Sequence, residues 1–167
     1  MNGFWKTFKP DQIVKDIQEI DFAKLKKMGI NALILDIDDT LIPREVNDIY
    51  PQVFEWIMAR KEEGFRLCLT SNSRHPLRVK YFGDALGLPA MHLSFKPLPF
   101  AFWKSMEILR SDPGETAMIG DQLFMDILGG NLVNLYTIYI EHGKEEIFWL
   151  RKWMRQAEAW VLSKLSS

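Results

Sequence analysis

Three carboxylates stand close together directly after an apolar stretch. Residues 32–35 are apolar, and Asp36, Asp38 and Asp39 follow, with Thr40 next in the chain. Like charges a few ångströms apart repel one another and disfavour ionisation. A fold tolerates such crowding where a bound cation compensates for the repulsion. We therefore expect this stretch to serve a metal site or a reaction.

Two further acidic residues and one lysine complete the set of candidate groups. Asp121 and Asp126 follow another apolar stretch, and Lys96 directly precedes a proline. Hard oxygen ligands suit Mg²⁺, which takes one or two protein carboxylates and keeps several waters. Asp36 and Asp121 could both reach such an ion, and Lys96 would add a second positive charge. Carboxylates, a metal, a lysine and a hydroxyl together suit a phosphoryl group.

These residue types can carry out phosphoryl transfer through a covalent intermediate. A carboxylate such as Asp36 can attack phosphorus and form an aspartyl-phosphate. A second carboxylate two residues further on, Asp38, can protonate the leaving oxygen and then activate water. Mg²⁺ and Lys96 would neutralise the charge on the transferred group. The sequence therefore predicts a phosphatase site and a phosphorylated substrate.

Short apolar segments alternate along the chain with segments of helical periodicity. This alternation predicts an α/β fold with a doubly wound parallel sheet and right-handed crossovers. Proline at the expected helix starts and glycine at several helix ends agree with it. Strands are expected at residues 32–37, 65–70, 90–93, 115–119 and 135–140. Helices are expected at residues 51–63, 75–86, 97–109, 122–128 and 144–165.

Polar residues lie where these strands end. Asp36 ends the first expected strand, and Asp121 follows the fourth. Ser71 and Asn72 follow the second strand, and Asn72 could either cap the next turn or touch substrate. In open parallel sheets, ligands bind beyond the carboxyl ends of the strands, so these residues should meet at one edge. Arg78, near the start of the next helix, is interpreted as solvated rather than as a contact to a second phosphate.

Four motifs, taken in chain order, resemble those of the haloacid dehalogenase (HAD) phosphatases. They are Asp36-Ile37-Asp38-Asp39-Thr40, Leu69-Thr70-Ser71-Asn72, Lys96, and Gly120-Asp121-x4-Asp126. The resemblance covers about residues 30–140, and the four motifs together are far more specific than any one alone.

The resemblance implies a role for each acidic residue. Asp36 would be the nucleophile and Asp38 the acid/base. The backbone carbonyl of Asp38 would join Asp36 and Asp121 as ligands of Mg²⁺. Asp126 would steady either the metal shell or Lys96.

The residues around the phosphoryl group follow from the same resemblance. Thr40, Ser71, Asn72 and Lys96 would bind the phosphate of the substrate. Thr70 competes with Ser71 for this role. We prefer Ser71, because Ser-Asn at the strand end is the closer match to the family's second motif.

A narrower resemblance is to the YqeG-type subclass IIIA of the superfamily. The matching stretches are Lys96-Pro97-Leu98-Pro99, Ile119-Gly120-Asp121-Gln122-Leu123-Phe124-x-Asp126, and Gly129-Gly130-Asn131 with Leu135-Tyr136-Thr137. Eukaryotic and photosynthetic relatives of this subclass are phosphatidylglycerophosphate phosphatases. The resemblance thus implies removal of the terminal phosphate from phosphatidylglycerophosphate. Asp39 stands where the subclass usually has Asn, and residues 132–134 replace a more usual Arg-Ala-Gly, which leaves substrate detail open.

The expected elements leave no room for a cap domain over the site. Ten residues, 41–50, separate Thr40 from the helix expected at 51. We expect a single domain over residues 1–167, with its core at about 30–140 and helical extensions at both ends. An open site suits large substrates, such as a protein, another subunit or a lipid headgroup in a bilayer.

The expected final helix is rich in tryptophan. Trp149, Trp153 and Trp160 are spaced by four and seven residues beside an apolar stripe. Tryptophan with nearby lysine and arginine suits a membrane surface. Apolar stripes at helical spacing more often pack on a core or on another subunit. The sequence therefore does not decide whether this helix contacts a membrane, packs on the core or forms a homo-oligomer.

Composition excludes several classes of protein. The net charge of −1 gives no sign of a nucleic-acid binder. Cys68 is the only cysteine, so no internal disulfide forms. Neither a spanning apolar run nor a signal-peptide core is evident, so we expect a cytoplasmic protein, peripheral on the inner membrane face at most. Rival functions are a phosphatase for a soluble phosphate ester and a partner protein that binds phosphate or metal without turnover.

Overall fold

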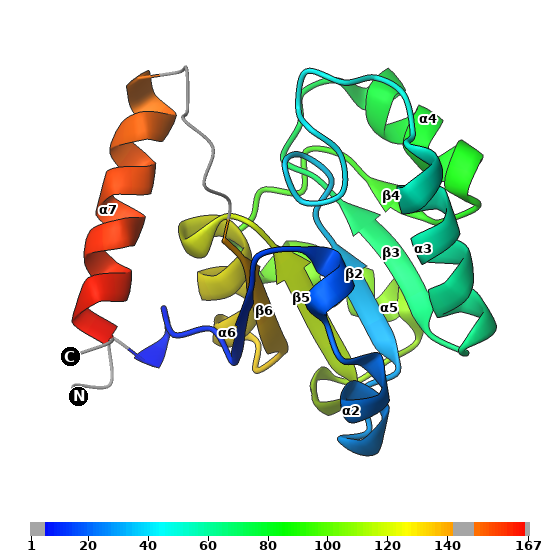
Figure 1. Cartoon of the computed structure of the whole chain (residues 1–167), viewed down its shortest axis with the longest axis horizontal. Helices are drawn as coiled ribbons and strands as arrows, with labels where there is room; N and C mark the ends of the chain where they lie inside the picture. The colour runs from blue at the N-terminus through cyan, green and yellow to red at the C-terminus, as the bar shows by residue number, and fades with distance from the viewer. Residues whose placement is uncertain (1–5, 142–148, 166–167) are drawn as a thin grey trace.

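A parallel sheet forms the centre of the molecule in this computed structural model, which describes residues 6–141 and 149–165 (Figure 1). Within those residues the sheet has six strands in the order β1-β6-β5-β2-β3-β4, and every neighbouring pair is parallel. The strands are β1 (Gln12–Val14), β2 (Ala32–Leu35), β3 (Arg66–Thr70), β4 (Ala90–Met91), β5 (Thr116–Gly120) and β6 (Tyr136–Ile140). The doubly wound α/β fold predicted from the sequence is therefore confirmed.

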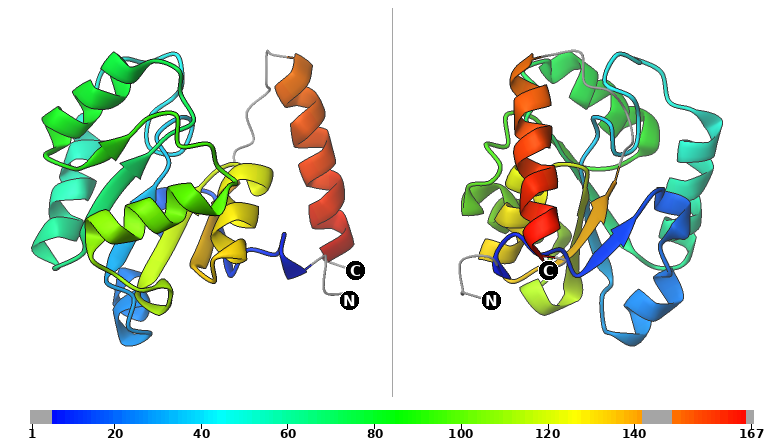
Figure 2. Two further views of the ribbon diagram at one scale, coloured as in Figure 1. Left: turned by 180° about the vertical axis from the view of Figure 1, so that it is seen from behind. Right: turned by 60° about the vertical axis from the view of Figure 1, so that its left-hand side comes forward.

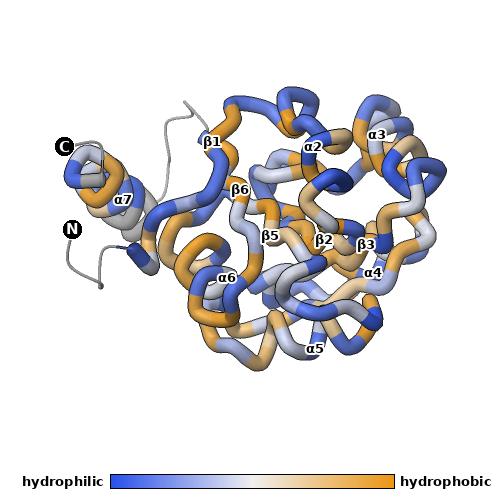
Figure 3. The backbone as a smooth tube through the Cα atoms, turned by 90° about the horizontal axis from the view of Figure 1, so that it is seen from below, coloured by the Kyte–Doolittle hydropathy of each residue, from blue (hydrophilic) through white to orange (hydrophobic). Residues whose placement is uncertain are grey.

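The helices cover both faces of the sheet. Seen from below, α2 and α3 lie on one side of the row of strands, and α5 and α6 lie on the other (Figure 3). The helical segments are η1 (Ile17–Glu19), α2 (Phe22–Lys27), α3 (Pro51–Glu62), α4 (Pro76–Leu86), α5 (Pro99–Leu109), η2 (Pro113–Glu115), η3 (Leu123–Ile127), α6 (Leu128–Leu132) and α7 (Trp149–Leu165).

Strand β2 shows why the sheet needs two helical layers. Its side chains alternate between the faces, as in any strand. Leu33 and Leu35 pack in the core cluster that includes residues of α2, α3 and α4. Ala32 and Ile34 pack in a second cluster that includes residues of α5. Because the strand is buried on both faces, its sequence reads as one continuous apolar run.

The strand order places a topological switch point at the middle of the sheet. From β2 the chain moves outward through β3 and β4, then returns to the other side of β2 as β5. Strands β2 and β5 are neighbours, with Leu35 paired to Ile119. Their carboxyl ends diverge into Asp36 and Asp121, and ligands bind at such a point in open α/β sheets.

The connections that follow β2 and β4 at this edge are short. Residues 36–50 link β2 to α3 and residues 92–98 link β4 to α5, without a helix or sheet strand of their own. The expectation of no cap domain is therefore confirmed.

The N-terminal extension differs from its prediction. It was expected to be helical, yet besides η1 and α2 it contributes the edge strand β1. Thr137 holds this strand in place, because its N–H donates to Asp11 Oδ2 at 2.8 Å and its carbonyl accepts from Asp11 N at 2.9 Å. Because the residue that stabilises β1 is distant in sequence, no local sequence pattern predicts this short strand.

The helix expected at 122–128 also differs in detail. The structure has a π-helical turn, η3, which continues directly into α6 and ends at Leu132. Single π-helical turns inside helices are frequent at functional sites. Here the turn lies directly after β5 and contains Asp126.

The final helix, α7, packs against η3 through part of one face (Figures 1 and 2). Val161 is buried in a cluster with Phe8, Leu123, Ile127 and Tyr139. The side chains of Trp149 and Trp153, like residues 144–148 of the expected helix, lie outside the described part of the chain.

Two observations bear on the membrane question for this helix. Trp160, which lies beside the predicted apolar stripe, is 56% exposed, so the core does not cover this tryptophan. Among the helices of the described residues, none is both long enough and apolar enough to span a bilayer.

Candidate active site

Lys96 is held at the centre of the polar edge by three oxygen acceptors. Its Nζ lies 2.6 Å from Asp36 Oδ1, 2.7 Å from Asp126 Oδ1 and 2.9 Å from the carbonyl of Thr70. The lysine side chain is 1% exposed and those of Asp36 and Asp126 are 4% and 0% exposed. Burial lowers the pKa of Lys96, but the two carboxylates outweigh it and raise that pKa above its ordinary value. The lysine therefore stays charged inside the protein.

Three buried carboxylates surround the switch point. One oxygen from each of Asp36, Asp121 and Asp126 lies within 4.8 Å of the others. Burial raises the pKa of Asp36 and that of Asp121 to about 7, and mutual repulsion adds to the effect, against the opposing pull of Lys96 on Asp36. Converging hard oxygen donors with excess negative charge fit a divalent cation such as Mg²⁺. A cation there would lower both pKa values.

The loop after β2 turns Asp38 away from this cluster. The carbonyl of Ile37 accepts from the N–H groups of Leu41 and Ile42 at 3.0 and 3.1 Å. Asp39 takes a left-handed conformation with φ of 62°, which aspartate tolerates better than most residues. Asp36 and Asp38 thereby face different partners.

The carboxylate of Asp38 lies among cationic and hydroxyl donors. Arg78 Nη1 donates to Asp38 Oδ1 at 2.5 Å, and Ser71 Oγ donates to Oδ2 at 3.4 Å. Arg44 Nη1 lies 4.0 Å from the same Oδ2. Arg78 was predicted to be solvated, and this was wrong, because its side chain is only 11% exposed and also donates to the carbonyl of Val46.

The hydroxyl of Thr40 bridges the two strands of the switch point. Its Oγ1 donates to Asp36 Oδ2 at 3.4 Å and to Asp121 Oδ1 at 3.3 Å. Thr70 points elsewhere, because its buried hydroxyl is 2.9 Å from Ser105 Oγ on α5. Of the two residues considered for the second motif, Ser71 is therefore the one whose hydroxyl faces the site.

Asn72 links the second motif to the segment that carries Lys96. Its Oδ1 accepts from Ser94 Oγ at 2.7 Å and from Lys96 N at 2.9 Å. Its Nδ2 donates to the carbonyl of Lys96 at 2.9 Å. The sequence left two interpretations of Asn72 open, a turn cap and a substrate contact. The observed bonds correspond to neither. Asn72 fixes the backbone on both sides of Lys96.

Gly120 makes room for Asp126. A Cβ at residue 120 would overlap the Asp126 carboxylate. Asp126 Oδ2 accepts from Gln122 N at 3.1 Å, and its Oδ1 faces Lys96. The Asp126 carboxylate therefore lies at the end of β5 and holds the Lys96 side chain in place. Contact with Lys96 is one of the two roles that the family resemblance implied for Asp126.

Sequence reasoning missed two residues of α7 that reach this edge. Arg155 Nη2 donates to Asp121 Oδ2, and its Nη1 donates to the carbonyl of Asp121. Glu158 is 2% exposed, and its Oε1 accepts from Leu123 N at 2.8 Å. Their spacing of three residues places both on one helix face. No sequence pattern shows which distant residue that face meets.

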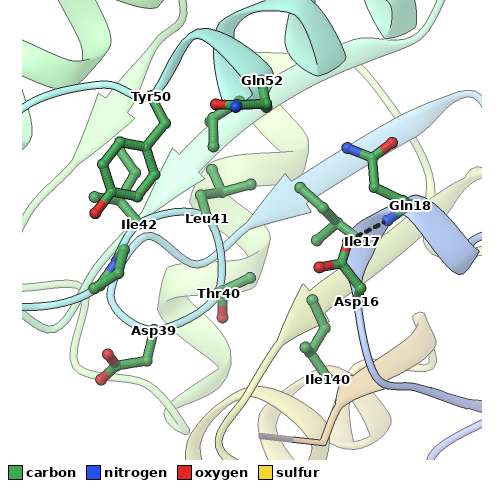
Figure 4. A pocket seen from close by; sticks show the side chains of 12 residues that line it. Asp16, Ile17, Gln18, Asp39, Thr40, Leu41, Ile42, Tyr50, Gln52 and Ile140 are labelled. Carbon is green, nitrogen blue, oxygen red and sulfur yellow. Dashed lines mark hydrogen bonds between the residues drawn. The ribbon is translucent and has the colours of Figure 1, made fainter.

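A cavity of about 590 Å³ lies beside the loop that follows β2 (Figure 4). Asp39 and Thr40 line one side, and Asp16 and Ile17 of the N-terminal segment line the other. Lys96 is not among its lining residues. The cavity therefore flanks the polar cluster and does not include the position where Lys96 and Asp36 meet.

Fold and site together define the class of HAD-like hydrolases, and comparisons with known proteins agree. A family model described as HAD-hydrolase-like matches residues 95–167. The chain is 33% identical over 160 residues to the probable phosphatase YqeG of Bacillus subtilis, covering 96% of this chain and 92% of that protein. The chain belongs to the HAD superfamily of phosphatases and, within it, to the YqeG-type family.

A second relative and one solved structure are also similar to the chain. The mitochondrial phosphatidylglycerophosphatase GEP4 of Saccharomyces cerevisiae is 29% identical over 129 residues, which covers 69% of each chain. A crystal structure of a HAD phosphatase from Thermococcus onnurineus superposes with a TM-score of 0.57 at 18% identity, covering 71% of this chain and 90% of that one. The latter likeness shows the shared fold.

Proposed function

We propose that this phosphatase is Mg²⁺-dependent, works through an aspartyl-phosphate on Asp36, and dephosphorylates phosphatidylglycerophosphate to phosphatidylglycerol. One observation carries the chemistry. The Asp36 carboxylate lies at the switch point between Lys96 and Asp121, while the Asp38 carboxylate faces a separate set of donors. A nucleophile and an acid/base are thereby held apart on one short loop.

The reaction would proceed in two displacements. In the first, an oxygen of Asp36 forms a bond to phosphorus, the ester P–O bond breaks, and Asp38 gives its proton to the leaving alkoxide. In the second, Asp38 takes a proton from water as that water attacks phosphorus. The acyl-phosphate bond then breaks and inorganic phosphate leaves, which restores the Asp36 carboxylate.

Binding of the phosphoryl group would fall to the residues around Asp36. Lys96 and the hydroxyl groups of Thr40 and Ser71 would contact its oxygens. Asp36, Asp121 and the backbone carbonyl of Asp38 would hold Mg²⁺, which when bound neutralises negative charge on the phosphoryl group. Asp126 would hold Lys96 in its orientation, as it does in the structure.

Two observations support a lipid substrate. The relative GEP4 is named a phosphatidylglycerophosphatase. The catalytic edge has no cap domain, so a headgroup could reach it while its acyl chains remain in a bilayer. We infer that the protein works on the cytoplasmic face of a membrane.

The direct test is phosphate release from phosphatidylglycerophosphate in mixed micelles with Mg²⁺, beside a panel of soluble phosphomonoesters. Asp36→Asn should abolish release, and Asp84→Asn, a substitution of an exposed aspartate on α4, should not change it. Faster turnover of soluble esters than of the lipid would refute the lipid assignment. The absence of release from every substrate would favour a non-catalytic phosphate-binding protein.

A further inference from the structure

Large apolar side chains are exposed around the edge where the site opens. They belong to the segments that follow β3 and β4, and such segments begin at the carboxyl edge of a parallel sheet. We call them the carboxyl-edge collar. Its members, each between 40% and 82% exposed, are Leu77, Leu93, Phe95, Leu98, Phe100 and Trp103. Large apolar side chains that are exposed along one edge of a molecule indicate a candidate interaction site.

In the segment between β4 and α5, buried side chains alternate with exposed ones. Ser94 and Lys96 are buried at 1% and 4% exposure, whereas Leu93 and Phe95 are 40% and 62% exposed. Leu93 and Phe95 have positive φ angles of 47° and 56°, which bulky residues rarely adopt. Strain of this kind persists where the surrounding structure holds it in place, commonly at functional sites. Here the same turn that directs Lys96 inward directs its apolar neighbours outward.

The collar borders the side from which the leaving group departs. The carboxylate of Asp38, which would protonate the leaving oxygen, contacts Ser71 and Arg78. The collar segment is hydrogen-bonded to the same strand end, because Ser94 N donates to the carbonyl of Ser71 at 3.1 Å and Leu93 N to that of Ser73 at 3.3 Å. Whatever remains attached to the leaving oxygen therefore emerges beside the collar.

The segments that carry the collar contribute no acidic side chain of their own. Residues 71–81 and 92–104 contain no Asp or Glu. Lys96 is buried and Arg78 is largely buried, each in an ion pair, so the exposed cations of these segments are Arg74, Lys80 and Lys104. Lys80 and Lys104 pair with Asp84 and Glu107 of the same helices. Exposed aromatic and aliphatic side chains with interspersed basic residues suit the interface of a bilayer that contains anionic lipid.

We propose that the carboxyl-edge collar seats this phosphatase on an anionic lipid bilayer, so that the headgroup phosphate reaches Asp36 while the acyl chains stay in the membrane. This proposal rests on the proposed function and names the surface by which the enzyme meets its substrate. It places the membrane contact at the β4–α5 segment rather than at the tryptophan-rich α7.

The test is vesicle flotation with a variant that the fold should tolerate. Phe95→Asn suits the left-handed backbone there, and Leu98→Ser puts a good capping residue at the start of α5, where no side-chain cap exists. Vesicles of phosphatidylcholine mixed with phosphatidylglycerol should bind the wild type. The double variant should bind about tenfold or more weakly, because two exposed apolar side chains are lost.

Matched controls separate the collar from the rest of the molecule. Trp160→Gln removes a 56% exposed tryptophan from α7 and should leave vesicle binding unchanged. Hydrolysis of soluble p-nitrophenyl phosphate reports on the catalytic centre alone, and the double variant should keep it. If wild type releases phosphate neither from phosphatidylglycerophosphate nor from p-nitrophenyl phosphate but binds vesicles through the collar, the proposed function fails while the surface assignment stands.

Three results would overturn the proposal. The first is that the double variant floats with vesicles as well as wild type does. The second is that Trp160→Gln alone abolishes flotation, which would move the contact to α7. The third is that wild type binds no vesicles but forms a dimer, by light scattering, which the double variant does not form. In that case the collar is an interface between two copies.

Discussion

Lys96 Nζ and Asp36 Oδ1 form an ion pair 2.6 Å long, with the two side chains only 1% and 4% exposed. Such a pair is costly to bury, and it persists because Asp126 and the carbonyl of Thr70 supply further acceptors to the lysine. The arrangement leaves negative charge in excess at the switch point. This excess gives a buried site where a cation and a phosphoryl group can both bind.

Substitution of Lys96 should therefore damage both stability and activity. Lys96→Met leaves Asp36 and Asp126 buried beside each other without a compensating charge. Removing one partner of a buried ion pair typically costs about 3–5 kcal/mol. We expect a loss of this size in urea denaturation at neutral pH, together with loss of phosphate release. Lys104→Met, which removes a half-exposed lysine paired with Glu107, should change stability by less than about 1 kcal/mol. Equal stabilities of the two variants would contradict the buried-pair interpretation.

The raised pKa values predict a pH-dependent response to metal. Without metal, Asp36 and Asp121 titrate at about 7 in the folded protein against 3.8 in the unfolded chain, chiefly through burial. The folded state thus binds more protons between those values, so stability falls as the pH rises from about 4 through about 7. Under the proposed function, Mg²⁺ would bind the ionised carboxylates of the folded state and should restore that stability.

Thermal unfolding with EDTA and with Mg²⁺ measures this coupling. The rise in Tm caused by Mg²⁺ should be larger at pH 8 than at pH 5, and Asp121→Asn should reduce it. A rise that is the same at both pH values would show that these carboxylates do not bind the ion.

The docking of α7 should depend on Glu158. Its Oε1 accepts from Leu123 N at 2.8 Å at the start of η3, and its Oε2 lies 3.2 Å from Arg155 Nη1. Glu158→Ala leaves a buried N–H without its acceptor, at a cost of about 1–3 kcal/mol. Glu158→Gln keeps an acceptor oxygen and should lose less, and Gln156→Ala, at an exposed position, should lose almost nothing. The order of these three variants in urea denaturation tests the contact, and a Glu158→Ala protein as stable as wild type would disprove it.

Gly120 should tolerate no side chain. A Cβ there would overlap the Asp126 carboxylate, which is held by Gln122 N and Lys96. Overpacking of this kind costs about 1–3 kcal/mol, and displacement of Asp126 should also lower kcat. Gly114→Ala is the matched control, because a Cβ there meets nothing within 4 Å. If kcat of Gly120→Ala equals that of Gly114→Ala, Asp126 does not position Lys96 for the reaction.

Much of the architecture could be predicted because its signals are local. The apolar runs before Asp36 and Asp121 predicted two buried strands, and the alternation of elements predicted that these strands are parallel. Parallel strands bring their carboxyl ends to one edge, so the meeting of Asp36 and Asp121 followed from topology. Lys96 was expected at the same site because it would add a positive charge beside the carboxylates, and the structure places it there.

Contacts that depend on distant partners could not be predicted in this way. Strand β1 is held by Asp11 and Thr137, which lie far apart in sequence. Arg155 meets Asp121 only because α7 returns across the end of β5. Arg78 looked like a solvated residue of a helix start, yet its helix directs it to Asp38. The sequence around Arg78 and Arg155 looks like that of an ordinary surface arginine, and the sequence around Asp11 looks like that of an ordinary loop aspartate.

The central claim is that the phosphoryl group passes through Asp36. Acid quenching during turnover, followed by peptide mass spectrometry, should find one phosphoryl group on the peptide that contains Asp36. With p-nitrophenyl phosphate, whose leaving group needs no proton, Asp38→Asn should accumulate this species, because the variant lacks the base that activates water, and its turnover should fall by about 10²–10⁴-fold. Asp36→Asn should show neither the modified peptide nor phosphate release. Phosphate release that continues in Asp36→Asn would contradict the account.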